Sequence, residues 1–282
     1  MTTDTTDTAI GIGKLTKAQR QAATKLGDAE ARYLVDQYYQ IQERRKATTN
    51  QTRSEFIEGE PFVFNLWLAE QFITLERQVK GILDAYTKND PLCAAVRQVV
   101  GIGPVTAAGL RAHIDIRKAK TAGAIWRFAG LDPTSKWGKG QKRPWNARLK
   151  VLCFKIGESF VKTQNAAGSE YGPLFRAKRD SLTEENEAGY FEETAAGILA
   201  TRRIGKDTIA YQHYAAGKLP DAHLHARARR WVVKQFLADY HKAAYHIILG
   251  EEPPVPYVIA HDPQHTHIRW GTWVPEIGGG DE

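Results

Sequence analysis

The amino-acid sequence predicts a mainly α fold, and three observations lead to that class. Apolar residues recur at helical spacing in several segments, turn residues separate these segments, and no convincing run of alternating polar and apolar residues indicates a strand. The chain has 282 residues, of which 42% are hydrophobic, enough for one or two packed cores. We therefore expect a helical N-terminal and coiled-coil-like segment, a central helix-hairpin-helix domain and a helical C-terminal extension.

The clearest periodicity lies in the first third of the chain. Thr16 is placed to cap a short helix over 17–26, and residues 28–57 favour a longer one. A heptad pattern follows, with apolar side chains spaced alternately by four and three. Its members are Leu68, Phe72, Leu75, Val79, Ile82 and Tyr86. Such a seam packs either within its own domain or against a second copy of the chain, and we favour the first for this helix. For the whole protein, a homodimer or higher oligomer is the expected assembly.

The remaining helices are expected to be short, except for the last one. Turn residues divide the chain into helices over 91–100, 104–114, 121–129 and 146–164, with a Gly/Pro/Trp/Lys loop over 130–146. One face of helix 146–164 carries Leu149, Leu152, Ile156 and Phe160. A long helix is predicted from Ala222 to Leu249. Its apolar seam comprises Val233, Leu237, Tyr240, Ala244 and Ile247.

Composition narrows the class of partner and the compartment. A net charge of +7 and a pI near 9.3 suit a polyanion, with nucleic acid as the first candidate. Cys93 and Cys153 lack a C-x-x-C arrangement and read as buried thiols in a reducing compartment. No secretory signal and no apolar stretch of about 18–20 residues is present. We expect a cytoplasmic, nucleoid-associated protein without a membrane partner.

A Gly-Ile-Gly turn at residues 101–103 is a candidate phosphate-binding device. Val100 precedes it, and the small residues Ala107 and Ala108 follow, which is the pattern of a helix-hairpin-helix. Glycine permits positive φ, and the free N–H groups of the helix start near Val105 would face a DNA phosphate. The alternative is a helix connection that binds nothing. The other copy, at residues 11–13, lacks this context and reads as a flexible lead-in.

Residues 133–150 combine positive charge with aromatic rings and contain no acidic residue. The cations are Lys136, Lys139, Lys142, Arg143, Arg148 and Lys150, and the rings are Trp137 and Trp145. This mixture suits a phosphate backbone together with stacking on unpaired or distorted bases. The alternative is a solvated loop whose tryptophans pack back on the core.

Two helices add basic stripes to this loop. Arg148, Lys155 and Lys162 are spaced by seven, so they share one face. The last long helix carries Arg227, Arg230, Lys234 and His241 away from its apolar seam. A single stripe is usually a solvated face, but together with the loop and the hairpin the two favour a DNA-binding surface.

Catalytic and metal-binding signals are weaker. Ser135 lies among cations and is the candidate nucleophile, although a lone loop serine is more often inert. The sequence shows no arrangement of carboxylates that indicates a two-metal site. The spacing of His261, His265 and His267 would allow them to share a metal ion. We favour the alternative, in which they belong to a polar tail that binds no metal. We assign no cofactor from the sequence, and a divalent metal stays a candidate.

The segments GIGPVTAAGLRAHI and IWRFAGLDP, followed by the basic loop and an Arg/Lys-bearing helix, carry a family resemblance. Over residues 65–165 the chain resembles the C-terminal domain of bridge-RNA-guided transposases, which also have a RuvC-like DEDD domain. The resemblance implies DNA binding, a guide-type RNA partner and recombination through a serine that follows Gly130-Leu131-Asp132-Pro133. The family places serine directly before a glycine, whereas here Trp137 precedes Gly138. Family members open with a strand and a catalytic aspartate, and Ile10-Gly11-Ile12-Gly13-Lys14 resembles that opening but has glycine in place of the aspartate, so we expect the RuvC-like domain to be absent.

The sequence patterns, together with the resemblance over residues 65–165, divide the chain into five expected regions. They are a helical N-terminal region (1–60), a coiled-coil-like linker helix (61–90), a helix-hairpin-helix transposase-like DNA-binding domain (91–165), a helical C-terminal region (166–250) and a Pro/His/Trp/Gly tail (251–282). The first hypothesis is a DNA-binding protein of transposase descent, acting in transposition or as a domesticated binder. The alternatives are an active serine-dependent transposase using Ser135, and a phage or mobile-element assembly protein.

Overall fold

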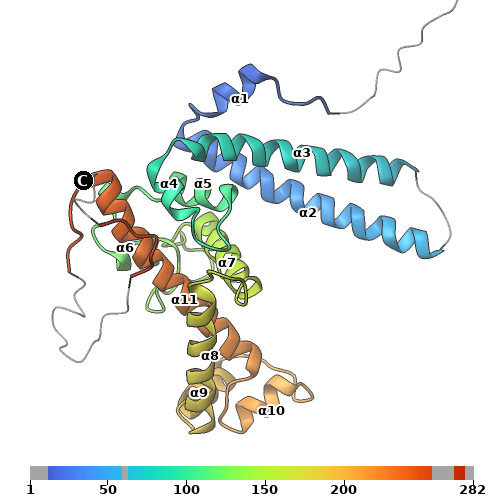
Figure 1. The fold of residues 1–282 in the computed structure, drawn as a ribbon. Helices are drawn as coiled ribbons and strands as arrows, with labels where there is room; N and C mark the ends of the chain where they lie inside the picture. The colour runs from blue at the N-terminus through green and yellow to red at the C-terminus, as the bar shows by residue number, and fades with distance from the viewer. Residues whose placement is uncertain (1–11, 59–62, 256–269, 277–282) are drawn as a thin grey trace, which may run out of the picture. The chain divides into compact units, whose positions relative to one another are not determined.

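The computed structural model describes residues 12–58, 63–255 and 270–276, and these residues form eleven α-helices and no strand (Figure 1). The prediction of a mainly α fold is therefore confirmed. The chain divides into two compact units. Unit 1 comprises residues 1–94 and 103–113, and unit 2 comprises residues 95–102 and 114–282. Among the described helices, none is long and apolar enough to cross a membrane.

Unit 1 is a helical hairpin with two shorter helices. Its helices are α1 (Lys17–Ala23), α2 (Asp28–Glu58), α3 (Val63–Lys88) and α5 (Pro104–His113), while α4 (Pro91–Val96) ends in unit 2. Thr16 caps α1 through a capping box with Gln19, as expected. The long helices α2 and α3 lie side by side, and α5 packs against both (Figure 1).

The residues of α3 that are buried in unit 1 differ in part from the predicted heptad seam. Val79 and Leu83 are buried with Val35, Val105 and Ala108, which come from α2 and α5. Leu83 is completely buried, whereas Ile82, the predicted seam residue, is only half-buried and Leu68 is exposed. The face of α3 that packs in this core therefore runs through Val79 and Leu83, which are spaced by four, and not through Ile82.

The apolar face of α3 thus packs inside unit 1, as favoured from the sequence. Leu75 and Tyr86, two members of the predicted seam, pack against the same core while remaining partly exposed. Whether the chain also dimerises stays a prediction.

Unit 2 is arranged around its longest helix. Its helices are α6 (Ala122–Phe128), α7 (Ala147–Lys162), α8 (Tyr171–Glu187), α9 (Glu192–Thr201), α10 (Ile209–Ala215) and α11 (Asp221–Ala244), with the short turns η1 (Ile116–Lys118) and η2 (Tyr245–Leu249). α11 packs against α6, α7 and α8, and α9 packs on α10. Thr121 and Asn146 cap α6 and α7 where the sequence predicted helix starts.

The predicted long helix is almost continuous. α11 passes into the π-helical turn η2, and Gly250 ends it in a left-handed conformation with φ of 69°. The helical stretch therefore ends at Leu249, as predicted.

The core of unit 2 lies where α7, α8 and α11 meet. All four apolar residues predicted on one face of α7 are buried. On α11, four of the five predicted seam residues are buried, and Ile247 is half-buried. Phe160 stacks on Tyr171 with ring centres 4.7 Å apart, and both pack against the ring of Phe236.

α7 and α11 approach closely at Gly157. A Cβ atom on Gly157 would lie 2.6 Å from Cγ of Arg229 and 3.1 Å from Cγ2 of Val233. A side chain at this position would therefore have to displace the Arg229 side chain, and Val233 would have to give way by a few tenths of an ångström.

His241 belongs to the core of unit 2 and not to the basic stripe. Its side chain is buried, and its Nε2 lies 2.9 Å from the carbonyl oxygen of Ala119. Burial lowers the pKa of His241 and so disfavours its charged form. The prediction of a cationic His241 on the exposed face of α11 is therefore wrong.

A buried acid joins the C-terminal residues to this core. The Tyr171 hydroxyl donates to Oδ2 of Asp239 at 2.5 Å, and Nε1 of Trp273 donates to the Tyr171 oxygen at 2.9 Å. Burial raises the pKa of Asp239 to about 7, even though the hydrogen bond from Tyr171 acts to lower it. At neutral pH the protein therefore holds a carboxyl group that resists ionisation.

The raised pKa of Asp239 predicts a specific pH dependence of stability. The folded protein binds this proton more tightly than the unfolded chain, where the pKa of Asp is about 3.9. The stabilisation is complete below about pH 4 and is lost as pH rises through about 7. Asp239→Asn should remove this decline, which amounts to a few kcal/mol at about 1.4 kcal/mol per pKa unit. Urea unfolding from pH 4 to 8 measures it, and parallel profiles for the two proteins would contradict it.

Candidate nucleic-acid interface

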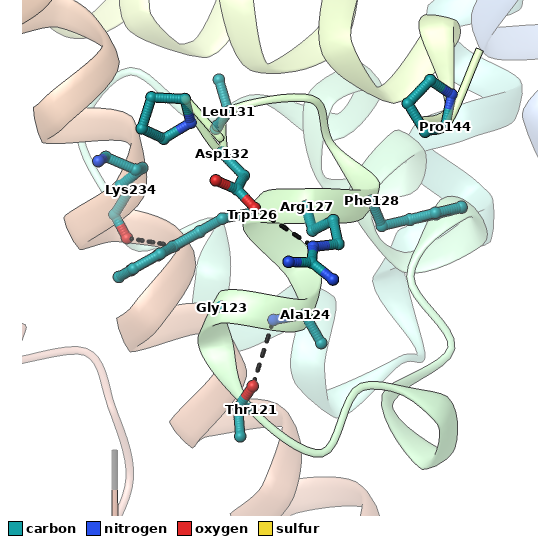
Figure 2. Close-up of a pocket in the computed structure, with 11 residues that line it drawn as sticks. Thr121, Gly123, Ala124, Trp126, Arg127, Phe128, Leu131, Asp132, Pro144 and Lys234 are labelled. Atoms are coloured by element: carbon teal, nitrogen blue, oxygen red, sulfur yellow. Dashed lines mark hydrogen bonds and ion pairs between the residues drawn. The ribbon is translucent and has the colours of Figure 1, made fainter. Parts of the chain in front are cut away.

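The basic loop, residues 133–150, starts from a fixed turn at Asp132. One carboxylate oxygen of Asp132 accepts hydrogen bonds from the backbone N–H and the hydroxyl of Thr134, at 2.9 and 2.7 Å. The other oxygen pairs with Nε of Arg127 at 3.2 Å (Figure 2). The hydrogen bonds from Thr134 and then Arg127 lower the pKa of Asp132 to about 2. This carboxylate therefore organises the chain locally and stays ionised.

Ser135, the candidate nucleophile, lies within this turn. Its Oγ is 3.5 Å from Oδ2 of Asp132. A carboxylate with a pKa of about 2 is a poor proton acceptor for a serine hydroxyl, because general-base catalysis works best with a pKa near the operating pH. The contact therefore does not supply the base that would activate Ser135.

Trp137 and Trp145 form the aromatic part of the loop. The Trp137 indole N–H donates to the carbonyl oxygen of Gln141 at 2.6 Å, which fixes the orientation of the ring. The two indoles meet edge to face, with centres 6.5 Å apart. The Arg143 guanidinium lies 4.9 Å from the centre of the Trp137 ring, and Nζ of Lys150 lies 4.2 Å from that of Trp145. Each ring is thus paired with a cation.

Gly130 allows Trp145 to reach this position. Gly130 has φ of 65°, and a Cβ atom there would lie 2.8 Å from Cγ of Trp145. A side chain would be strained by the backbone and would also displace the indole.

The exposed side of α11 adds three cations. Arg227, Arg230 and Lys234 follow one another at helical spacing. Nζ of Lys234 lies 5.4 Å from the centre of the Trp126 ring, and the Trp126 indole N–H donates to the carbonyl oxygen of Lys234 (Figure 2). The Arg227 guanidinium lies 4.8 Å from the centre of the Phe191 ring.

Positive charges from the loop and from α11 act on one another. Partial desolvation, followed by the charges of Arg230 and Arg143, lowers the pKa of Lys150. Desolvation and the charge of Arg230 likewise lower the pKa of Lys234. Desolvation and the charges of Arg227 and Arg229 lower the pKa of Arg230.

We call the set Arg143, Lys150, Arg227, Arg230 and Lys234 the cationic stripe. In the described part of the chain, none of these five forms an ion pair with a carboxylate.

Two hollows lie beside the cationic stripe and share Leu131. The first, of about 740 Å³, is lined by Trp126, Arg127, Phe128, Asp132 and Lys234 among others (Figure 2). The second, of about 640 Å³, we call the loop groove. Its lining includes Trp137, Arg143, Trp145, Lys150, Val151, Phe154, Arg229, Arg230 and Val233.

The structure thus brings together part of the predicted DNA-binding set. The loop groove unites Trp137, Arg143, Trp145 and Arg230. Lys234 lines the first hollow, and Arg227 lines neither of the two. The other predicted contacts of the loop and of α7 line neither hollow. They are Lys136, Lys139 and Lys142, which are exposed on the loop, and Arg148 and Lys155 on α7.

Sequence reasoning missed several residues of the loop groove. Val151 and Phe154 are about half exposed on the side of α7 opposite its buried face. Their three-residue spacing on a polar face was a signal for an exposed apolar patch. Arg229 was hidden within the run of arginines at 227–230; it pairs with Glu158 and covers the ring of Phe154.

The glycine turn is closed by contacts within unit 2. Gly101 has φ of 100°, and its carbonyl oxygen accepts a hydrogen bond of 2.6 Å from the Ser159 hydroxyl. Ile102 is buried, as predicted for a residue that plugs a core. Positive φ was expected at both glycines, but only Gly101 has it.

Val105, the predicted helix start, lies in α5 after Gly103 and Pro104. Its side chain is buried in the core of unit 1, so only backbone groups could serve a phosphate there. Phosphate binding by this turn stays a prediction.

Three histidines of the tail are the candidate metal ligands. His261, His265 and His267 lie outside the described residues. Among the residues that are described, no group of three or more His, Cys, Asp or Glu side chains is placed to hold a metal ion.

Part of the chain that forms this surface matches a known protein family. Residues 93–150 match the model of the transposase IS116/IS110/IS902 family. The matched segment is about a fifth of the chain and runs from α4 through the glycine turn and the basic loop to Lys150 in α7. Comparisons with curated proteins and with solved structures gave no match. The family match supports a transposase-derived role in DNA transposition.

The lowered pKa values of the cationic stripe predict an unusual effect on stability. Arg230→Gln removes a charge that its neighbours repel, so Tm should not fall and should rise slightly at low salt. The gain should shrink at 1 M salt, where the Debye length is about 3 Å. Arg229→Gln is the matched control and should lower Tm, because Arg229 pairs with Glu158. Thermal unfolding followed by circular dichroism measures both, and equal losses of Tm would contradict the prediction.

Proposed function

We propose that this protein binds DNA through unit 2 and acts in DNA transposition or recombination as a binder of transposase descent. The observation that carries the proposal is the cationic stripe, in which cations from the basic loop and α11 face one another beside the loop groove. Part of this surface, including Trp137 and Arg143, lies within the segment that matches the transposase family.

The electrostatics favour a polyanion as the partner. Cations that repel one another raise the free energy of the unbound protein, and a phosphate backbone would relieve that repulsion while releasing counterions from the DNA. The tryptophans at the loop supply flat apolar faces, which an acidic protein partner would not need. DNA therefore fits both the charge and the aromatic content of the surface.

We favour binding over strand transfer. The alternative, an active transposase, uses Ser135 as the nucleophile, but the neighbouring Asp132 is too weak a base to activate it. Trp137 also stands directly before Gly138, where the resembled family has its serine. A guide-type RNA, oligomerisation and nucleoid association remain expectations from the sequence, and a polyanion site of this kind would accept RNA phosphates as well.

The salt dependence of DNA affinity tests the proposed function. The double variant Lys150→Gln/Arg230→Gln should bind DNA more weakly. Its plot of log K against log salt should be shallower by about 2, since each lost phosphate contact removes about 0.9 from the slope. Fluorescence anisotropy with a labelled duplex between 50 and 200 mM salt measures this.

The matched control removes two charges from unit 1. Lys17→Gln/Lys25→Gln changes exposed lysines that form no ion pair in the described structure, and it should leave affinity and slope nearly unchanged. Equal effects of the two double variants would mean that general charge, and not the cationic stripe, governs binding.

A further inference from the structure

The loop groove is lined by apolar and by cationic side chains. We call the apolar group Leu131, Val151, Phe154 and Val233 its floor, and the cationic group Arg143, Lys150 and Arg230 its rim. Val151 is 52% exposed and Phe154 is 50% exposed, so part of the floor is open to solvent. A phosphate backbone alone would use the rim and leave this apolar surface uncovered.

Trp137 stands at the groove as an exposed ring in a fixed orientation. It is 42% exposed, yet its N–H is held by the carbonyl oxygen of Gln141 and the Arg143 guanidinium lies against the ring. Gln141 also accepts a hydrogen bond from the backbone N–H of Gly138 through its side chain, which closes the turn that carries the indole. An aromatic ring held in this way loses little conformational entropy when a flat ligand stacks on it.

We propose that the loop groove holds an unpaired nucleobase stacked on Trp137, so that the substrate class is single-stranded or locally opened DNA. The inference rests on the proposed DNA binding and adds to it the state of the strand. In a duplex the base faces are covered by their neighbours, and only an unpaired base presents a flat face to an indole.

The neighbouring charges fit the same occupant. Arg143, Lys150 and Arg230 surround the groove without carboxylate partners among the described residues and can receive the phosphates that flank the base. Arg229 is already paired with Glu158, so it serves the wall of the groove through its packing on Phe154. The groove thus offers an aromatic ring for stacking, apolar side chains for contact with a base and cations for the flanking phosphates.

Three DNA probes of equal length separate stacking from charge. They are a labelled single strand of about 20 nucleotides, the same strand as a duplex, and a strand of abasic units that keeps the phosphates and lacks the bases. Trp137→Ala in the full chain should weaken single-strand binding by about 5-fold to 150-fold, the range measured for the loss of one stacked base. It should change the affinity for the duplex and the abasic strand by less than about 2-fold.

Two further variants serve as controls. Trp137→Phe retains a flat ring and should keep most of the single-strand affinity, which a loss of folding would not allow. Tyr190→Ala removes another exposed aromatic ring of unit 2 that does not line the loop groove, and it should change none of the three affinities.

The possible outcomes are distinct. If Trp137→Ala changes no affinity, or lowers all three equally, the base-binding groove is wrong while DNA binding by the cationic stripe stands. If the unmodified protein binds none of the probes at low salt, the proposed function and this inference both fail. A loss confined to the single strand, rescued by Trp137→Phe, supports the inference.

Discussion

The packing of α7 against α11 positions the cationic surface of unit 2. α11 buries Ala228, Val232 and Phe236 completely, and Gly157 lets α7 pack against this helix without displacing the Arg229 side chain. Burial of one face fixes the rotation of α11 about its axis. The intervening positions, which carry Arg227, Arg230 and Lys234, must then face away from the core.

This packing also explains how a cationic surface arises from segments far apart in the sequence. The basic loop runs into the first turn of α7, which Asn146 caps and which carries Lys150. Because α7 is held against α11, Lys150 comes near enough to Arg230 for the charge of Arg230 to help lower the pKa of Lys150. The apolar core supplies the stability that lets these like charges remain together, and the resulting surface is suited to a polyanion.

Sequence reasoning predicted the local features well and the long-range ones poorly. Thr16 was predicted to cap the first helix and does so, because capping depends only on neighbours in the chain. The predicted starts at 121 and 146 also agree with the structure, where Thr121 and Asn146 are the caps. Periodicity identified the buried face of α7 but placed Ile82, not Leu83, in the core of unit 1, and it assigned His241 to the surface. The floor of the loop groove was missed because Phe154 occupies a position that periodicity alone assigns to solvent.

Lysine labelling with and without DNA tests the central claim most directly, namely that the cationic stripe of unit 2 is the DNA-binding surface. Amine acetylation read by mass spectrometry compares Lys150 and Lys234 with the exposed lysines 17 and 25 of unit 1. The account predicts that DNA slows labelling of Lys150 and Lys234 and leaves the other two nearly unchanged. Unchanged labelling of Lys150 and Lys234, or protection confined to unit 1, would contradict it.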